Sequence, residues 1–94
     1  MVKVQNLTND RGTTLANQFV IVANGKTYFQ SYETPIAKKM SNGKVILSID
    51  WDYSATTRRS LYTFLRKFCY ISVYCKKDLQ NLIDSGAIKV KKII

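Results

Sequence analysis

The sequence predicts an α+β domain, in which an antiparallel β-meander of three to five strands is followed by two helices packed on one face of the sheet. Two observations support this fold class. Asn24-Gly25 and Asn42-Gly43 each lie between segments rich in β-branched and aromatic residues, and an Asn-Gly pair in that setting is a strong signal for a β-hairpin. After Trp51 the hydrophobic period changes from two residues to about 3.6 residues. Strands come first and helices follow, which is typical of an α+β fold.

The strands are expected in short runs of β-branched and aromatic residues separated by turns. These runs are residues 2–7, 18–23, 26–32, 36–40, 44–49 and 88–91. Pro35 predicts a bend at residues 33–35, or an edge position that lacks one donor, because proline has no backbone N–H to donate. The run 36–40 also fits a short helical turn, although a strand is favoured. Alternating lysines in the last run indicate a short edge strand.

The longest helix is expected to begin after Ser54, whose hydroxyl can accept a backbone N–H, and to run toward Cys69. Its apolar face is formed by residues at helical spacing, namely Leu61, Phe64, Leu65 and Phe68. A second helix is expected over residues 76–85, ending at Gly86. The sequence YISVY at residues 70–74 fits either a helical extension or a strand, and the choice stays open.

Composition limits the function. The chain of 94 residues is expected to form one domain, and 46% hydrophobic residues are enough for a packed core. A formal charge of +9 favours an anionic partner, such as nucleic acid, an acidic protein surface or a lipid surface. No apolar signal segment or membrane-spanning run is visible, so we expect a soluble cytoplasmic protein with no membrane partner. Cys69 and Cys75 fit neither a zinc spacing nor a disulfide framework, and we expect reduced, partly buried thiols.

A basic segment is the main functional signal. Residues 53–77 contain no acidic residue, and at about 100° per residue three arginines fall together on one helix face with a tyrosine among them. Such cations can neutralise phosphates without reading base sequence, and tyrosines between them can stack on unpaired bases. Solvation of the helix and contact with an acidic protein are the alternatives. The candidate nucleic-acid or partner-binding residues are Arg58, Arg59, Tyr62, Arg66, Lys67, Lys76 and Lys77.

Two further groups have both a structural and a functional interpretation. Lys89, Lys91 and Lys92 fit protection of an edge strand as well as an ancillary phosphate contact. On a strand, Tyr28, Gln30 and Tyr32 share one face, while Phe29 enters the core. An open aromatic sheet face would resemble the platforms of single-strand RNA readers, but helix packing over that face is favoured.

The sequence gives little support for catalysis. Asp50 and Asp52 flank Trp51, and paired carboxylates can hold a metal or divide acid and base roles. No third ligand is visible, so charge compensation at the helix N-terminus is the favoured role for the pair. The chain has no histidine, no nucleophile elbow and no phosphate-binding glycine loop. We therefore expect a protein that is not an enzyme and needs no cofactor or metal.

Several motifs resemble a family of small, mostly uncharacterised proteins encoded by bacteriophages and other mobile elements. They are ANQF at residues 16–19, YFQSY at residues 28–32, Ile36-Ala37, WDYS at residues 51–54 with Thr56-Thr57, and Phe64-Leu65. The resemblance covers roughly residues 5–90. It implies a bacterial or phage cytoplasm and an accessory role, and it supplies no established activity or functional residue.

The sequence therefore leads to a basic, non-catalytic module that contacts nucleic acid, mainly through backbone phosphates. The competing hypothesis is a protein-binding inhibitor of a bacterial defence system, of the anti-CRISPR type, whose partner is a host nucleoprotein or defence complex. A third hypothesis is a small assembly component of a phage. The oligomeric state is left open, a homodimer included.

Overall fold

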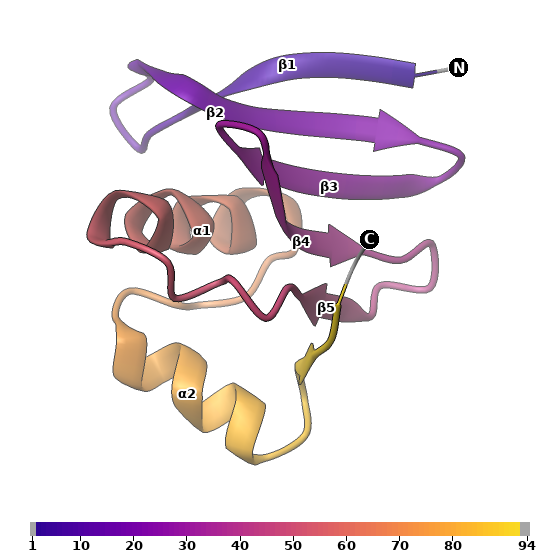
Figure 1. Cartoon of the computed structure of the whole chain (residues 1–94), viewed down its shortest axis with the longest axis vertical. Coiled ribbons are helices and arrows are strands. Elements are labelled where there is room, and N and C mark those ends of the chain that lie inside the picture. Colours follow the sequence, from indigo (N-terminus) through magenta and orange to yellow (C-terminus); the bar gives the residue numbers. More distant parts are fainter. Residues whose placement is uncertain (1, 93–94) are drawn as a thin grey trace.

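Six strands form one sheet, with the helices inserted between the fifth and sixth strands (Figure 1). The computed structural model describes residues 2–92. The elements are β1 (Val2–Thr8), β2 (Thr14–Ala23), β3 (Lys26–Ser31), β4 (Thr34–Lys39), β5 (Val45–Leu47), α1 (Ala55–Phe68), α2 (Lys76–Asp84) and β6 (Lys89–Val90). Strand order in space follows chain order from β1 to β6. The predicted α+β fold is confirmed: β1–β5 form an antiparallel meander of five strands, and β6 lies where the terminal edge strand is expected.

The two Asn-Gly pairs form the β2–β3 and β4–β5 turns. Asn24 and Gly25 have φ angles of 54° and 78°, the positive values that a two-residue type I′ turn requires. The β4–β5 turn is wider, because Met40 donates its N–H to the carbonyl of Lys44 at 2.8 Å. Gly43 supplies the positive φ there, and the Asn42 side chain accepts the Lys44 N–H. Both predicted hairpins are therefore confirmed, with different local geometry.

The bend before β4 falls earlier than proline predicts. Residues 32 and 33 make the turn, Tyr32 has a φ of 55°, and Pro35 already lies within β4. The β3–β4 register shifts between Phe29 and Gln30. Such an irregularity inserts a residue on one strand and lets neighbouring side chains turn to the same side. Ile36 and Ala37 are both buried as a result.

The final strand pairs in parallel with β5, an arrangement that no sequence pattern indicated. Leu47 lies opposite Val90, and the Lys91 N–H donates to the Leu47 carbonyl at 2.8 Å. The chain between these strands contains both helices, so it is long enough for the crossover that parallel pairing requires. The expected edge strand is confirmed in position, and its parallel pairing with β5 is a feature that the sequence did not predict.

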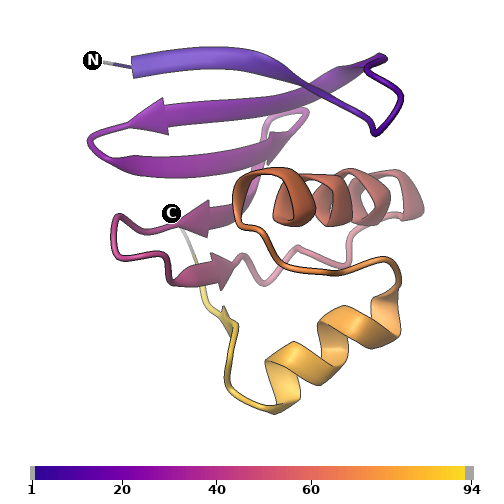
Figure 2. The ribbon, with the colours of Figure 1, turned by 180° about the vertical axis from the view of Figure 1, so that it is seen from behind.

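Helix α1 packs across one face of the sheet, and α2 lies beyond the β5 end of the sheet in both views (Figure 1, Figure 2). The predicted Ser54 cap is present, with the Thr57 N–H donating to the Ser54 hydroxyl at 3.1 Å. The predicted apolar face is also present. Leu61 and Phe64 are fully buried, and the Phe64 ring stacks on Phe29 with centroids 5.6 Å apart.

Residues 70–74 form neither a helix nor a strand. The chain reverses after α1 at Tyr70, whose φ is 56°, and the Ile71 N–H then donates to the Leu65 carbonyl at 3.1 Å. Val73 is fully buried and anchors the segment to the core. Helix α2 ends as predicted at Gly86, whose φ is 83° and whose N–H donates to the Ile83 carbonyl.

The helix covers the sheet face opposite to the one favoured by sequence. Phe29 and Ser31 point toward α1, and the Ser31 hydroxyl lies 3.0 Å from the Thr57 hydroxyl. Tyr28 and Gln30 alternate with them and point to the other side, which leaves both partly exposed. The expectation that a helix covers the Tyr28 face is wrong, because Phe29, on the other side of β3, is the residue that packs against Phe64 of α1.

Candidate nucleic-acid interface

The starts of the two helices meet at a shared carboxylate. Asp52 accepts from Arg58 Nη1 at 2.7 Å and lies 2.7 Å from Lys76 Nζ through its other oxygen. Hydrogen bonding by Lys76, opposed by burial and reinforced by Arg58, lowers the pKa of Asp52 below its ordinary value of 3.8. The first turn of α1 contains no acidic residue. Asp52 lies just outside the helix, two residues before the Ser54 cap, and it is the counter-ion between two cations there.

Tyr62 is placed differently from the other candidate residues. Its side chain is 7% exposed and belongs to the hydrophobic core, so its ring is not offered to a stacking base. Its hydroxyl is buried with no hydrogen-bond partner among the described residues. Burial raises the pKa of Tyr62 above its ordinary value of 10.0. The periodicity placed Tyr62 among the arginines correctly, but the folded chain buries the Tyr62 side chain in the core.

Arg66 holds three parts of the chain together. Its guanidinium donates to the Val73 carbonyl at 2.6 Å and to Asp10 at 3.0 Å. It also lies over the Tyr74 ring, 4.7 Å from the centroid. Only 18% of its side chain is exposed. This arginine connects α1 to the β1–β2 loop and to the 70–75 segment, so its contacts are structural.

Lys67 has a similar structural role. Its ammonium donates to the Thr8 carbonyl at 2.8 Å, the Thr8 hydroxyl at 3.1 Å and the Asn9 carbonyl at 2.7 Å. Three donors on an ammonium group match these three acceptors. The end of β1 is thereby fixed to the end of α1.

The remaining candidates form a largely exposed set, which we name the cationic band: Arg58, Arg59, Lys76 and Lys77. Arg59 and Lys77 are exposed and make no ion pair within the part of the chain that the structure describes. Arg58 and Lys76 share the single carboxylate of Asp52. Four positive charges against the one carboxylate that pairs with them leave an excess of +3 within this set. An excess of this kind attracts anions, and it extends from α1 to the start of α2.

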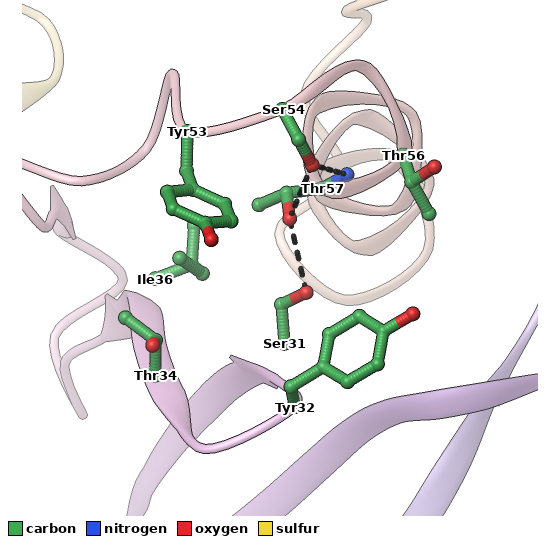
Figure 3. Close-up of a pocket in the computed structure, with 8 residues that line it drawn as sticks. All are labelled: Ser31, Tyr32, Thr34, Ile36, Tyr53, Ser54, Thr56 and Thr57. Atoms are coloured by element: carbon green, nitrogen blue, oxygen red, sulfur yellow. Dashed lines mark hydrogen bonds between the residues drawn. The ribbon is translucent and has the colours of Figure 1, made fainter.

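A polar pocket lies beside the band at the N-terminus of α1, where no sequence motif had indicated one. Its volume is about 440 Å³, and its walls include the rings of Tyr32 and Tyr53 (Figure 3). The hydroxyls of Ser31, Thr57 and Ser54 form a hydrogen-bonded row along its floor. Among the described residues, its lining contains no charged side chain, cysteine or histidine, so no nucleophile–base pair is present. The pocket can offer hydrogen bonds and aromatic surface.

The two cysteines differ in exposure. Cys75 is exposed, contrary to the expectation of partial burial, whereas Cys69 is half-buried. Burial raises the pKa of the Cys69 thiol from 9.0 to about 11. Both thiols are free. Across residues 2–92, no group of three His, Cys, Asp or Glu side chains is placed to hold a metal ion. Neither helix within this range is long and apolar enough to cross a membrane.

Sequence comparison identifies the family. A family model described as a family of unknown function, DUF8033, matches residues 2–81. The chain belongs to this family. The match extends from β1 into α2 and so includes the cationic band, while β6 lies beyond it. No curated protein and no solved structure matches the chain. The expectation of an uncharacterised family is confirmed at this level.

Proposed function

We propose that this member of the DUF8033 family is a non-catalytic, basic module that binds nucleic acid through backbone phosphates. The observation that carries the proposal is the cationic band, where four cations share one carboxylate. Phosphate groups compete with Asp52 for Arg58 and Lys76, whereas Arg59 and Lys77 form no ion pair within the described chain. Contacts of this type give affinity without base specificity.

The architecture supports surface binding. Arg58 and Arg59 are fixed on a helix that is capped by Ser54 and buried on its other side. Lys76 and Lys77 begin the next helix. Cations on two ordered helices have fixed backbone positions, which reduces the conformational entropy lost when an extended polyanion binds. Together with the resemblance to small phage-encoded proteins, this favours an accessory nucleic-acid binder in the cytoplasm of a bacterial host.

Charge reversal at the free cations tests the proposal. Arg59→Glu and Lys77→Glu are measured singly and together, by fluorescence anisotropy with a labelled duplex across a salt series. Each single change lowers the formal charge from +9 to +7, because one cation is lost and one acid is gained. We expect each to weaken binding and to reduce the slope of log affinity against log salt by about 0.9, the value for one duplex phosphate contact.

Lys3→Glu is the matched control. Lys3 is exposed on β1, outside the cationic band, and its reversal changes the formal charge by the same amount. We expect this variant to bind nearly as well as the unchanged protein. Equal losses for Lys3→Glu and Arg59→Glu would show that net charge alone matters and would overturn the proposed interface. Absence of binding at low salt would overturn the proposed function itself.

One observation favours a protein partner as a second candidate function. Four large side chains near the helices are strongly exposed, namely Ile49 at 62%, Tyr53 at 79%, Tyr70 at 85% and Tyr74 at 70%. Tyrosine and arginine are enriched at the energetic centres of protein interfaces. An inhibitor of the anti-CRISPR type would use this surface on a host defence complex. Capture of such a complex from nuclease-treated lysate, lost on Tyr53→Ala and Tyr70→Ala, would support this second function.

A further inference from the structure

The sheet face opposite α1 is open, and it carries aromatic, aliphatic and lysine side chains. This is the face turned away from α1, toward the viewer in Figure 1. One row crosses the whole sheet on this side, according to the strand register: Val4, Ile21, Tyr28, Lys38, Ile46 and Lys89. Val4 is 58% exposed, and no element of the described chain covers it. We name this surface the open face.

Two aromatic rings lie diagonally next to each other on the open face. Phe19 on β2 pairs with Gln30, two residues along β3 from Tyr28. Diagonal neighbours of this kind have Cα atoms about 7–8 Å apart, within reach of large side chains. Both rings are partly exposed. Residues at these two positions can each offer a ring to an unpaired base, as on other sheet platforms that bind single strands.

The charged side chains on the strands of the open face are all lysines. Lys38 lies directly opposite Tyr28 on β4, and Lys26 lies on the same side of β3. Within residues 2–92, none of the six strands contains an acidic residue. At the β5–β6 end, a hollow of about 330 Å³ is lined by Lys44, Lys89 and Lys91. The aromatic rings are therefore bordered by lysines that can contact phosphates.

We propose that the open face binds single-stranded nucleic acid. Bases stack on Phe19 and Tyr28, and the phosphate backbone runs past Lys38 toward the lysine-lined hollow. This site is separate from the cationic band, which contacts phosphates on the other side of the molecule. It goes beyond the proposed function because it selects unpaired bases, which a duplex does not expose.

The same charges argue against a second copy as the occupant. Two open faces placed together would bring Lys26, Lys38 and Lys89 of one copy against the lysines of the other, with no acid on the described strands of either copy. Like charges facing each other across an interface are destabilising. A single strand instead supplies both the planar bases and the negative charge.

The test uses fluorescence anisotropy with a labelled oligo(dT) or oligo(U) strand and a duplex of equal length. Tyr28→Leu and Phe19→Leu keep an apolar side chain on the open face and remove the ring. Stacking on one aromatic ring corresponds to about 5- to 150-fold in affinity by alanine substitution. We expect each leucine variant to lose about 5-fold or more on the single strand, with little change on the duplex. Tyr28→Phe is the matched control and should bind as the unchanged protein does.

A direct readout avoids dependence on the fold of a variant. An oligonucleotide with 5-iodouracil is irradiated with the unchanged protein, and cross-linked peptides are identified by mass spectrometry. Cross-links at Phe19 or Tyr28 support the proposal.

If cross-links are confined to α1 and α2, and Tyr28→Leu binds the single strand as well as the unchanged protein does, the open-face site is overturned. The proposed role of the cationic band is then unaffected. The open-face site alone is likewise overturned if Arg59→Glu loses single-strand binding and Tyr28→Leu loses none of it. The site is also overturned, in favour of a dimer, if the unchanged protein self-associates without binding a single strand and Tyr28→Leu abolishes that self-association. No binding of any nucleic acid overturns both proposals together.

Discussion

Removal of the carboxylate at position 52 should strengthen nucleic-acid binding while weakening the fold. In Asp52→Asn the side chain keeps its size and loses its charge, so the formal charge rises from +9 to +10. Arg58 and Lys76 each lose an ion pair of 2.7 Å. Both cations then become available to phosphate. A stabilising acid in the middle of a binding surface predicts opposite effects on stability and on affinity.

The magnitudes follow from exposure and from counterion release. Asp52 is 36% exposed, and exposed ion pairs contribute about 0.2–1 kcal/mol each, so the free energy of unfolding should fall by roughly 0.5–2 kcal/mol. A duplex phosphate contact contributes about 0.9 to the salt slope. If both cations gain a phosphate, the slope should steepen by up to about 2.

The assay pairs a urea melt with a duplex titration followed by anisotropy at several salt concentrations. We expect a lower midpoint in urea, a higher affinity and a steeper salt dependence for Asp52→Asn. Asp84→Asn serves as the control, because Asp84 is exposed on α2, makes no ion pair among residues 2–92, and its change gives the same formal charge. Asp52→Asn with unchanged or weaker affinity, or with no more gain than Asp84→Asn, would refute the reasoning.

Three further predictions concern the fold and its titration. Lys67→Met should lower the free energy of unfolding by about 1.5–3 kcal/mol in a urea melt, because the variant loses a charged donor to Thr8 and Asn9. Lys77→Met, the control, should change the free energy of unfolding by less than about 0.5 kcal/mol. The pKa of Asp52 is lowered in the folded state, so its contribution to stability is fully present above pH 3.8 and is lost as the pH falls through the folded-state pKa. The difference in the free energy of unfolding between the unchanged protein and Asp52→Asn should therefore be constant near neutral pH and shrink in acid. A difference that grows in acid would contradict this. Burial raises the pKa of Cys69 from 9.0 to about 11, which lowers its thiolate fraction about a hundredfold, so iodoacetamide should modify Cys75 first, and Cys75→Ser rather than Cys69→Ser should remove the fast phase.

Local sequence signals predicted most of the fold. Asn24-Gly25 predicted its hairpin because positive φ at both residues is a local requirement. Ser54 and Gly86 predicted a helix start and a helix end for the same reason, since capping uses only nearby atoms. The parallel partner of β6 could not be predicted in this way. It depends on where a crossover with two helices returns, and that is decided by tertiary packing.

The sequence also could not predict which face of the sheet α1 covers. Tyr28 and Phe29 occupy alternate sides of one strand, and period-two alternation does not say which side meets a helix. The burial of Phe29 against Phe64 decides it. The result reverses the expected role of Tyr28, from a residue beneath a helix to one on the open face.

The cationic residues show a second limit of the sequence. An acid-free segment from residue 53 to residue 77 suggests free cations, but acids outside the segment reach back to it in the folded chain. Asp10, 56 positions before Arg66, pairs with it across the β1–β2 loop. Helical periodicity indicated the direction of each side chain, and only the tertiary fold separates structural cations from those of the cationic band.

The most direct test of the cationic band is a salt titration of duplex binding by the unchanged protein, Arg59→Glu and Lys3→Glu. We predict affinity that falls steeply with salt, a slope reduced by about 0.9 in Arg59→Glu, and a slope unchanged in Lys3→Glu. No binding at low salt, or the same loss in Lys3→Glu as in Arg59→Glu, would contradict the proposed phosphate-binding role.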